Sequence, residues 1–243
     1  MTAPRTPSRK VRLWLGRRGT KLSMLAASAA LVLAGCGSVH PGSAAVVGAE
    51  TITHSEVDEL ADAFCSASVS TAQAQGQAAP ETATRGAREG ALQLLLETAL
   101  SRQFGEHENV DPDPQQVSQA LEQNEQGVAL VPPGQREGLR SVLREYAEAQ
   151  LMLVEAGRKS LAADSTTQVP DEQAFAEGER LRTDFVNGLD VEVDPRYGTF
   201  SEGAIQRGTS SLSVPASDDA RAGARAEPAA AWVSALPASQ KCS

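Results

Sequence analysis

The stretch from Ala45 to Phe64 constrains the fold of this chain more than any other part of the sequence. Ala45–Val47 favours a strand, the next three residues favour a turn, and Thr51-Ile52 continues the extended run. Thr53 and Glu56 then match a capping box, in which Thr53 is the N-cap of a helix. Apolar residues follow at helical spacing: Val57, Leu60, Ala61 and Phe64. The stretch predicts a tiny hairpin that leads into an amphipathic helix.

Four further helices are predicted by apolar residues at helical spacing. The second helix runs from about Thr84 to Glu106. A short third helix has Asp113 as N-cap and Pro114 at its first position, and it stops near Gly127. A long helix and a last major helix follow, over about 135–162 and 171–187. The prediction is a mainly α fold: about five helices that form a cradle, with two or three very short strands.

The remaining segments read as strand, turn or loop. Ser66 to Thr82 is small, polar and aperiodic, and it predicts a loop. Leu189–Val193 alternates as a strand does, and Asp194–Phe200 predicts a turn. The tail, Ser201 to Ser243, is rich in Ser, Ala, Gly and Pro and is expected to be mostly loop. Its exception is Pro228–Leu236, which predicts two helical turns around Trp232.

The first 35 residues carry seven Lys or Arg and no acidic residue. The apolar run Leu22–Val32 is too short to span a bilayer comfortably, and this combination is typical of a secretory signal peptide. The run ends in Leu33-Ala34-Gly35-Cys36, which resembles a bacterial lipobox. The resemblance implies that the signal peptide (1–35) is removed and that Cys36 is lipidated as the new N-terminus; the alternative is an ordinary signal peptide that contains a Cys.

Lipidation would place the protein on the extracytoplasmic face of the bacterial cell membrane. Two or more acyl chains hold a protein stably on a lipid bilayer. Residues 36–43 are small and polar and are expected to form a tether to a domain over 44–200, with a C-terminal tail over 201–243.

Charge and composition argue against several classes of partner. Seven of the 22 Lys and Arg lie in the signal, so 15 remain against 31 Asp and Glu, a net charge of about −16. Such a surface repels phosphate backbones, so nucleic acid is not expected as a partner. Aromatic residues make up only 4% of the chain, which argues against a sugar-binding platform.

No catalytic residue, metal site or cofactor is predicted. The sequence has no nucleophile elbow, P-loop, dinucleotide fingerprint or metal-spaced Cys/His cluster, and no small-molecule substrate is evident. His54 and His107 are read as ordinary surface residues. Asp111 and Asp113 are read as a turn and a cap rather than as calcium ligands.

With Cys36 lipidated, two cysteines remain, Cys65 and Cys242. In an oxidising compartment an even pair is usually bridged, so a disulfide between them is possible. The alternative is that Cys65 is a small core residue and Cys242 a free thiol.

Four segments together resemble the N-terminal chaperone domain of the SurA, PrsA and PpiD group of extracytoplasmic foldases. They are "VVGAETITHSEVDEL", "ALQLLLETALSRQFGEHENVDPDPQQVSQAL", "LREYAEAQLMLVEAGRKSLAAD" and "LDVEVDPRYGTF". The chain departs from that pattern at Gly48-Ala49 and at Glu108-Asn109-Val110. The resemblance covers about 44–200 and implies that Ala45–Val47 pairs with Val191–Val193.

The resemblance implies a membrane-anchored holdase chaperone that binds unfolded exported polypeptides. Apolar stripes that exceed what one thin domain can hide would agree with this function, although all of them could instead fill the core. Only Ser160 to Pro170 lies where parvulin-type members insert their isomerase domain, so no isomerase activity is expected. A scaffold or adaptor lipoprotein that binds one folded envelope partner is the alternative. The residues that bind clients are not identified by the sequence.

Overall fold

The computed structural model describes residues 41–162, 169–206, 215–225 and 228–242. The predicted signal peptide, Cys36 and most of the tether lie outside the described residues. No helix of the described part is both long and apolar enough to cross a membrane.

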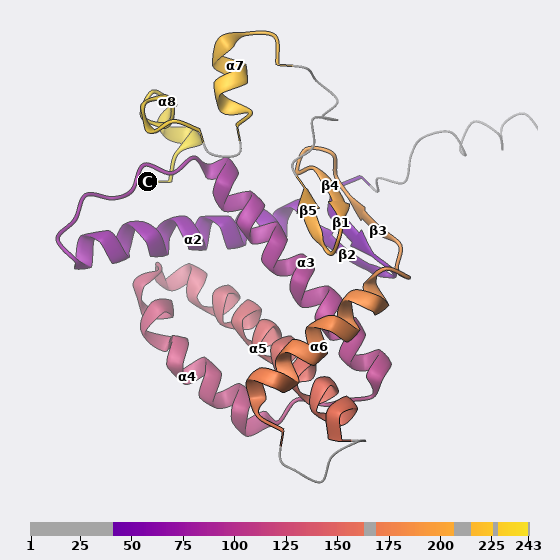
Figure 1. Cartoon of the computed structure of the whole chain (residues 1–243). Helices are drawn as coiled ribbons and strands as arrows, with labels where there is room; N and C mark the ends of the chain where they lie inside the picture. The colour runs from indigo at the N-terminus through magenta and orange to yellow at the C-terminus, as the bar shows by residue number, and fades with distance from the viewer. Residues whose placement is uncertain (1–40, 163–168, 207–214, 226–227, 243) are drawn as a thin grey trace, which may run out of the picture. The chain divides into compact units, whose positions relative to one another are not determined.

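The described residues form a mainly helical fold with a small antiparallel sheet, as predicted (Figure 1). Five of the helices are long and two are short. In chain order the elements are β1 (Ser43–Val47), β2 (Glu50–Thr53), α2 (His54–Ala74), α3 (Thr84–Glu108), α4 (Pro114–Leu130), α5 (Pro133–Ala162), α6 (Asp171–Val186), β3 (Val191–Val193), β4 (Thr199–Ser201), β5 (Ala204–Gln206), α7 (Asp218–Gly223) and α8 (Ala230–Ser234), followed by one 3₁₀ turn (Ala238–Gln240).

The predicted pairing of the first and last strands of the domain is confirmed. The sheet has the order β2-β1-β3, and Ala45, Val46 and Val47 lie opposite Val193, Glu192 and Val191 in antiparallel register. Gly48 adopts a φ of +58°, which allows the tight turn from β1 to β2. The two segments that meet here are far apart in the sequence, so the sheet closes the helical part of the chain into one unit.

The predicted start of α2 is also confirmed. The Thr53 hydroxyl accepts a hydrogen bond from the Glu56 N–H, and the Glu56 carboxylate accepts one from the Thr53 N–H. The predicted end was wrong, because α2 continues through Ser66–Ala74, which we expected to be loop. That stretch contains no helix breaker before Gly76, where φ is +68°, and its Ala72 is buried.

The core lies where α3 crosses α2 and α5 and reaches the sheet. The apolar side predicted for α3 is buried there through Leu92, Leu96, Ala99 and Leu100, whereas Phe104 is buried in a second cluster with Leu153 and Ala156 of α5. Gln103 of α3 donates a hydrogen bond from Nε2 to the Val47 carbonyl, 3.0 Å away. This bond ties α3 to the end of β1.

The connection between α4 and α5 is shorter than predicted. Asp113 and Pro114 do begin α4, and the Asp113 carboxylate accepts from the Gln115 N–H at 2.8 Å. The helix passes through Gly127, however, and ends only at Leu130. Burial of Val128, which packs in the core, offsets the cost of a helical glycine, about 1 kcal/mol.

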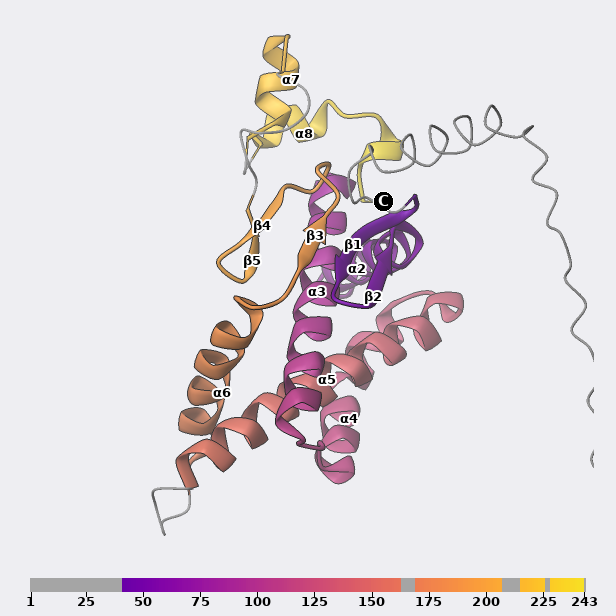
Figure 2. The same cartoon turned by 90° about the vertical axis from the view of Figure 1, so that its right-hand side faces the viewer.

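The tail contains more structure than predicted (Figure 2). The helical turn around Trp232 is present as α8, whereas the hairpin of β4 with β5 and the helix α7 were not expected. Trp232 donates from Nε1 to Asp219 of α7 and packs against Gly223, at whose position a Cβ would collide with the indole ring. The indole therefore joins α7 to α8.

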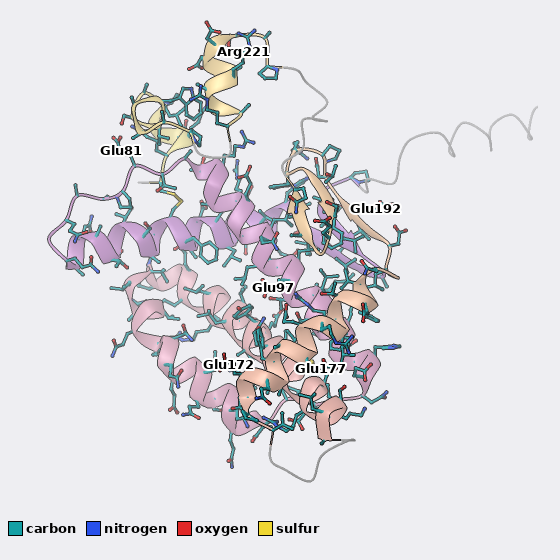
Figure 3. The ribbon with its side chains drawn as sticks, in the orientation of Figure 1. Glu81, Glu97, Glu172, Glu177, Glu192 and Arg221 are labelled. Atoms are coloured by element: carbon teal, nitrogen blue, oxygen red, sulfur yellow. A yellow bond between two sulfur atoms is a disulfide. The ribbon has the colours of Figure 1, made fainter. Side chains whose placement is uncertain are left out.

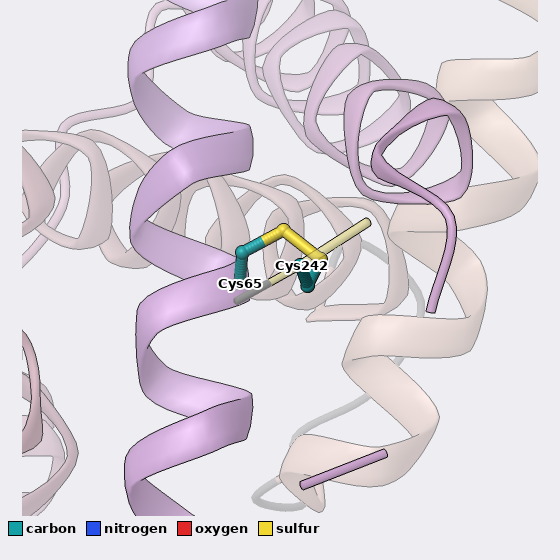
Figure 4. Close-up of a disulfide and its surroundings, with 2 residues drawn as sticks. All are labelled: Cys65 and Cys242. Carbon is teal, nitrogen blue, oxygen red and sulfur yellow. A yellow bond between two sulfur atoms is a disulfide. The ribbon is translucent and has the colours of Figure 1, made fainter. Parts of the chain in front are cut away.

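A disulfide joins Cys65 on α2 to Cys242, 177 residues later (Figure 4). Their Cα atoms lie 4.9 Å apart, within the usual range for a disulfide. Beside it, Cys242 N–H donates to the Thr82 carbonyl at 2.9 Å, and Ala83 forms a β-bridge with Lys241. The end of the tail is thus fixed to α2 and to the start of α3.

Candidate binding cleft

The apolar stripes of α2 and α3 are largely buried in the core, whereas several apolar side chains of α5 and α6, such as Leu143 and Leu181, keep part of their surface accessible. Among the described residues, the large apolar side chains with the greatest exposure are Leu130 and Phe175, at 36% and 37%. Any site for an apolar segment must therefore be a concave one. The structure provides such a site between two helices.

A cleft of about 460 Å³ lies between α2 and α5, with α3 behind it. Its lining residues on α2 recur at helical spacing, from Glu56 through Leu60 to Ala63, and a matching face of α5 lies opposite. The apolar part of the lining consists of Leu60, Ala63, Leu95, Leu139 and Val142. Leu60, Ala63 and Leu139 are almost fully buried, whereas Leu95 and Val142 keep part of their surface accessible. The cleft therefore offers an apolar floor that belongs to the edge of the core.

Exposed carboxylates form the rim of this cleft. Glu56, Glu59 and Asp62 come from α2, and Glu145 comes from α5 on the other side. Glu59 and Glu145 accept hydrogen bonds from Ser55 and Ser141 of their own helices. No Lys or Arg contributes to the lining.

In the described part of the chain, the rim carboxylates lack the ion pairs that several other carboxylates of the long helices make. Each of the five long helices carries at least one carboxylate that pairs with an Arg: Asp58, Glu89, Glu125, Glu155 and Asp171 are examples. The four rim carboxylates do not take part in the ion pairs found between described residues. The rim is therefore a patch of uncompensated negative charge around an apolar floor.

Two glycines of α5 widen the cleft. Gly134 and Gly138 line it one helical turn apart, and a Cβ at either position would meet nothing within 4 Å. Gly138 lies inside the helix, where glycine costs stability relative to alanine, and no close neighbour requires it. Nearby, the Oε1 atom of Gln135 is buried without a hydrogen-bond partner among the described residues. The α5 wall therefore has open space at its glycines and, at Gln135 Oε1, a hydrogen-bond acceptor without a partner among the described residues.

A second cavity, of about 530 Å³, lies between the start of α3 and the tail. Its lining includes Arg85, Arg88 and Trp232, but these side chains are already engaged. Arg85 pairs with Glu89 and donates to the Gly223 carbonyl, and Arg88 pairs with Asp58. These contacts hold the tail in place, so we regard this cavity as structural.

His54, read from the sequence as an ordinary surface residue, instead lies in a cluster with the β3–β4 turn. Its Nε2 is 3.2 Å from the carboxylate of Asp194, and its Nδ1 is 3.2 Å from the Tyr197 hydroxyl. Burial alone would raise the pKa of Asp194, but hydrogen bonds from Arg196 hold that pKa below its usual value. The cluster fastens the start of α2 to the turn that follows the sheet.

Asp113 and His107, which were also singled out in the sequence, make contacts that stabilise the fold. Asp113 caps α4, and the ring of His107 packs 5.0 Å from that of Phe185. In the part of the chain that the structure describes, no group of three or more His, Cys, Asp or Glu is placed to hold a metal ion.

Comparison with known proteins identified no relative of this chain. No family model, no curated protein and no solved structure matches the chain. The likeness to the SurA, PrsA and PpiD group therefore stays a prediction from the four segments quoted above.

Proposed function

We propose that this protein is a lipid-anchored holdase of the extracytoplasmic space, and that the cleft between α2 and α5 binds short segments of unfolded exported polypeptides. The observation that carries the proposal is an open apolar floor with a glycine wall, in a domain with few fully exposed large apolar side chains. The resemblance of the first and last segments to foldase chaperones supports the same function. No enzymatic activity is proposed.

The size of the cleft fits weak, reversible binding. If a client segment buries roughly 300 Å² of apolar surface there, the gross gain is about 7 kcal/mol at about 25 cal/mol/Å². Association costs of about 4 kcal/mol leave about 3 kcal/mol, which corresponds to a dissociation constant of roughly a few millimolar for one segment. Such binding delays aggregation and releases the client without ATP.

The anchor follows from the sequence rather than from the described residues. Acylation at Cys36 would hold the cleft close to the membrane from which exported chains emerge. Replacing Cys36 with Ala should remove the lipid mass and release the processed protein from the membrane fraction. A variant that stays membrane-bound after signal removal would refute the lipobox interpretation.

A blocked cleft tests the holdase directly. Gly138→Leu places a side chain in the open space on the α5 wall, whereas Gly127→Leu adds the same side chain at an exposed α4 glycine outside the cleft. We expect the wild type and Gly127→Leu to slow aggregation of a denatured client, and Gly138→Leu to lose most of this effect. Equal protection by all three proteins, or none beyond that of albumin, would contradict the proposal.

The small exposed apolar surface favours a second candidate, an adaptor lipoprotein that binds one folded envelope partner. Chemical cross-linking in intact membranes separates the two functions. A holdase should give a broad distribution of cross-linked masses, whereas an adaptor should give one stoichiometric product.

A further inference from the structure

The cleft has one property that a general apolar site does not need. Around its apolar floor, carboxylates stand on both walls without a cation among the lining residues. Glu56, Glu59 and Asp62 follow one another at three-residue intervals along α2, so they are near neighbours on one helix face. Like charges at this spacing repel each other, and a cation brought to the rim relieves the repulsion.

We infer that the cleft selects polypeptide segments in which Lys or Arg stands next to apolar residues. This inference rests on the proposed function and names its substrate class. Apolar side chains of the segment would lie on Leu95 and Val142, which are only partly buried. Its cationic side chains, whose apolar stems can also cover the floor, would reach the rim.

The arrangement of the carboxylates favours a polypeptide over a metal ion. Within the described residues no set of three acidic, His or Cys side chains is close enough to hold one ion. Charges spread over two helices instead suit a ligand that carries several separated cations. The distribution along α2 and across to α5 matches an extended chain better than a single small cation.

The expected contribution of each rim carboxylate is modest. All four are exposed, and an exposed ion pair changes an equilibrium by about twofold. Removing three charges should therefore weaken binding of a cationic segment by roughly tenfold. The effect should shrink as salt rises, because exposed charges are screened within about 10 Å at 0.1 M salt.

The test uses three fluorescent ten-residue peptides, in which Leu alternates with Lys, with Ser or with Glu. Their binding to the protein, purified as its host cell processes it, is measured by fluorescence anisotropy at low and high salt. The variant Glu59→Gln/Asp62→Asn/Glu145→Gln leaves the capping residue Glu56 intact. Its control makes the same change in net charge away from the cleft, at three exposed carboxylates: Asp111→Asn/Glu122→Gln/Glu172→Gln. Figure 3 shows Glu172 on α6, which does not line the cleft.

We expect the wild type to bind the Leu–Lys peptide most tightly. The cleft variant should bind that peptide with roughly tenfold lower affinity, and the control variant with an affinity lower by about twofold or less. Circular dichroism and thermal unfolding establish that both variants fold. If the Leu–Ser peptide binds as tightly as the Leu–Lys peptide, or if both triple variants lose the same affinity, charge selection is refuted and the holdase stands. If no peptide binding is sensitive to Gly138→Leu, the site itself is refuted, and with it the proposed function.

Discussion

The two ends of α5 use glycine in opposite ways. Near its end, Gly157 packs against α6, and a Cβ there would collide with the carbonyl oxygen of Ala174; Gly178 of α6 faces the Leu153 carbonyl in the same manner. Near its start, Gly138 faces open space in the cleft. Gly157 and Gly178 let α5 and α6 pack closely, whereas Gly134 and Gly138 leave space between α5 and α2.

The two ends of α5 also differ in how their charged side chains are paired. At the α5–α6 seam, Arg158 pairs with Asp171, and the Ser160 hydroxyl donates to Glu177. At the cleft, the rim carboxylates take part in no ion pair among the described residues, although Glu59 and Glu145 accept hydrogen bonds from serines of their own helices. The comparison teaches that a seam built for stability compensates its charges, whereas the cleft leaves charge and space available for an occupant.

The largest expected effect comes from removing the disulfide that holds α2, one wall of the cleft. The disulfide holds α2 at Cys65, and in the chain-entropy model closure of a loop of this length is worth up to about 5 kcal/mol, often less in practice. Cys242→Ser should lower the free energy of unfolding and increase hydrogen exchange in α2 beyond Cys65, while exchange at the α5–α6 seam changes less. Alkylation of the denatured, unreduced wild type should label neither Cys65 nor Cys242. Labelling of both would contradict the bridge.

The seam should break when its glycine gains a methyl group. In Gly157→Ala the new Cβ meets backbone rather than a flexible side chain, so α5 and α6 must separate. We expect a loss of about 3 kcal/mol in the free energy of unfolding, measured by chemical denaturation. A loss below about 1 kcal/mol would mean that the two helices are not packed as closely as described.

The sequence could not distinguish these two kinds of glycine. Gly138 and Gly157 both lie inside one predicted helix, and only their neighbours, from distant segments, separate their roles. The sequence did predict the hairpin, the capping box and the strand pairing, because these follow from local chemistry or from the order of familiar segments. It missed the cleft, since the α2 wall and the α5 wall come together only through tertiary packing.

The open end of α5 should respond in the opposite sense. Gly138→Ala removes a flexible glycine from a helix, and its Cβ meets nothing within 4 Å. We therefore expect a gain of about 0.5–1 kcal/mol in the free energy of unfolding. Gly127→Ala in α4 is the control and should gain a similar amount. If Gly138→Ala destabilises the protein whereas the control does not, the space beside Gly138 is occupied in the folded state, contrary to our description.

The smallest effect should come from the charge compensation at the seam. The Glu177 carboxylate accepts hydrogen bonds from Arg180 of its own helix and from Ser160 of α5, and the Arg180 contact in particular lowers the pKa of Glu177 from 4.5 to about 2. A carboxyl group whose pKa is lower in the folded state stabilises the fold at pH values above about 4.5. This contribution is lost as the pH falls from about 4.5 through about 2.

Glu177→Gln removes that contribution and isolates its pH dependence. The wild type should exceed the variant in free energy of unfolding by less than about 1 kcal/mol near pH 6, because Arg180 is largely exposed and solvent screens the pair. The difference should be clearly smaller at pH 2.5 and should disappear only below about pH 2. Glu145→Gln at the cleft, which breaks no ion pair, is the matched control for loss of a carboxylate. A gap between wild type and Glu177→Gln that is equal at pH 6 and pH 2.5 would show that the ion pair does not support the seam, and the contrast between the two ends of α5 would then rest on the glycines alone.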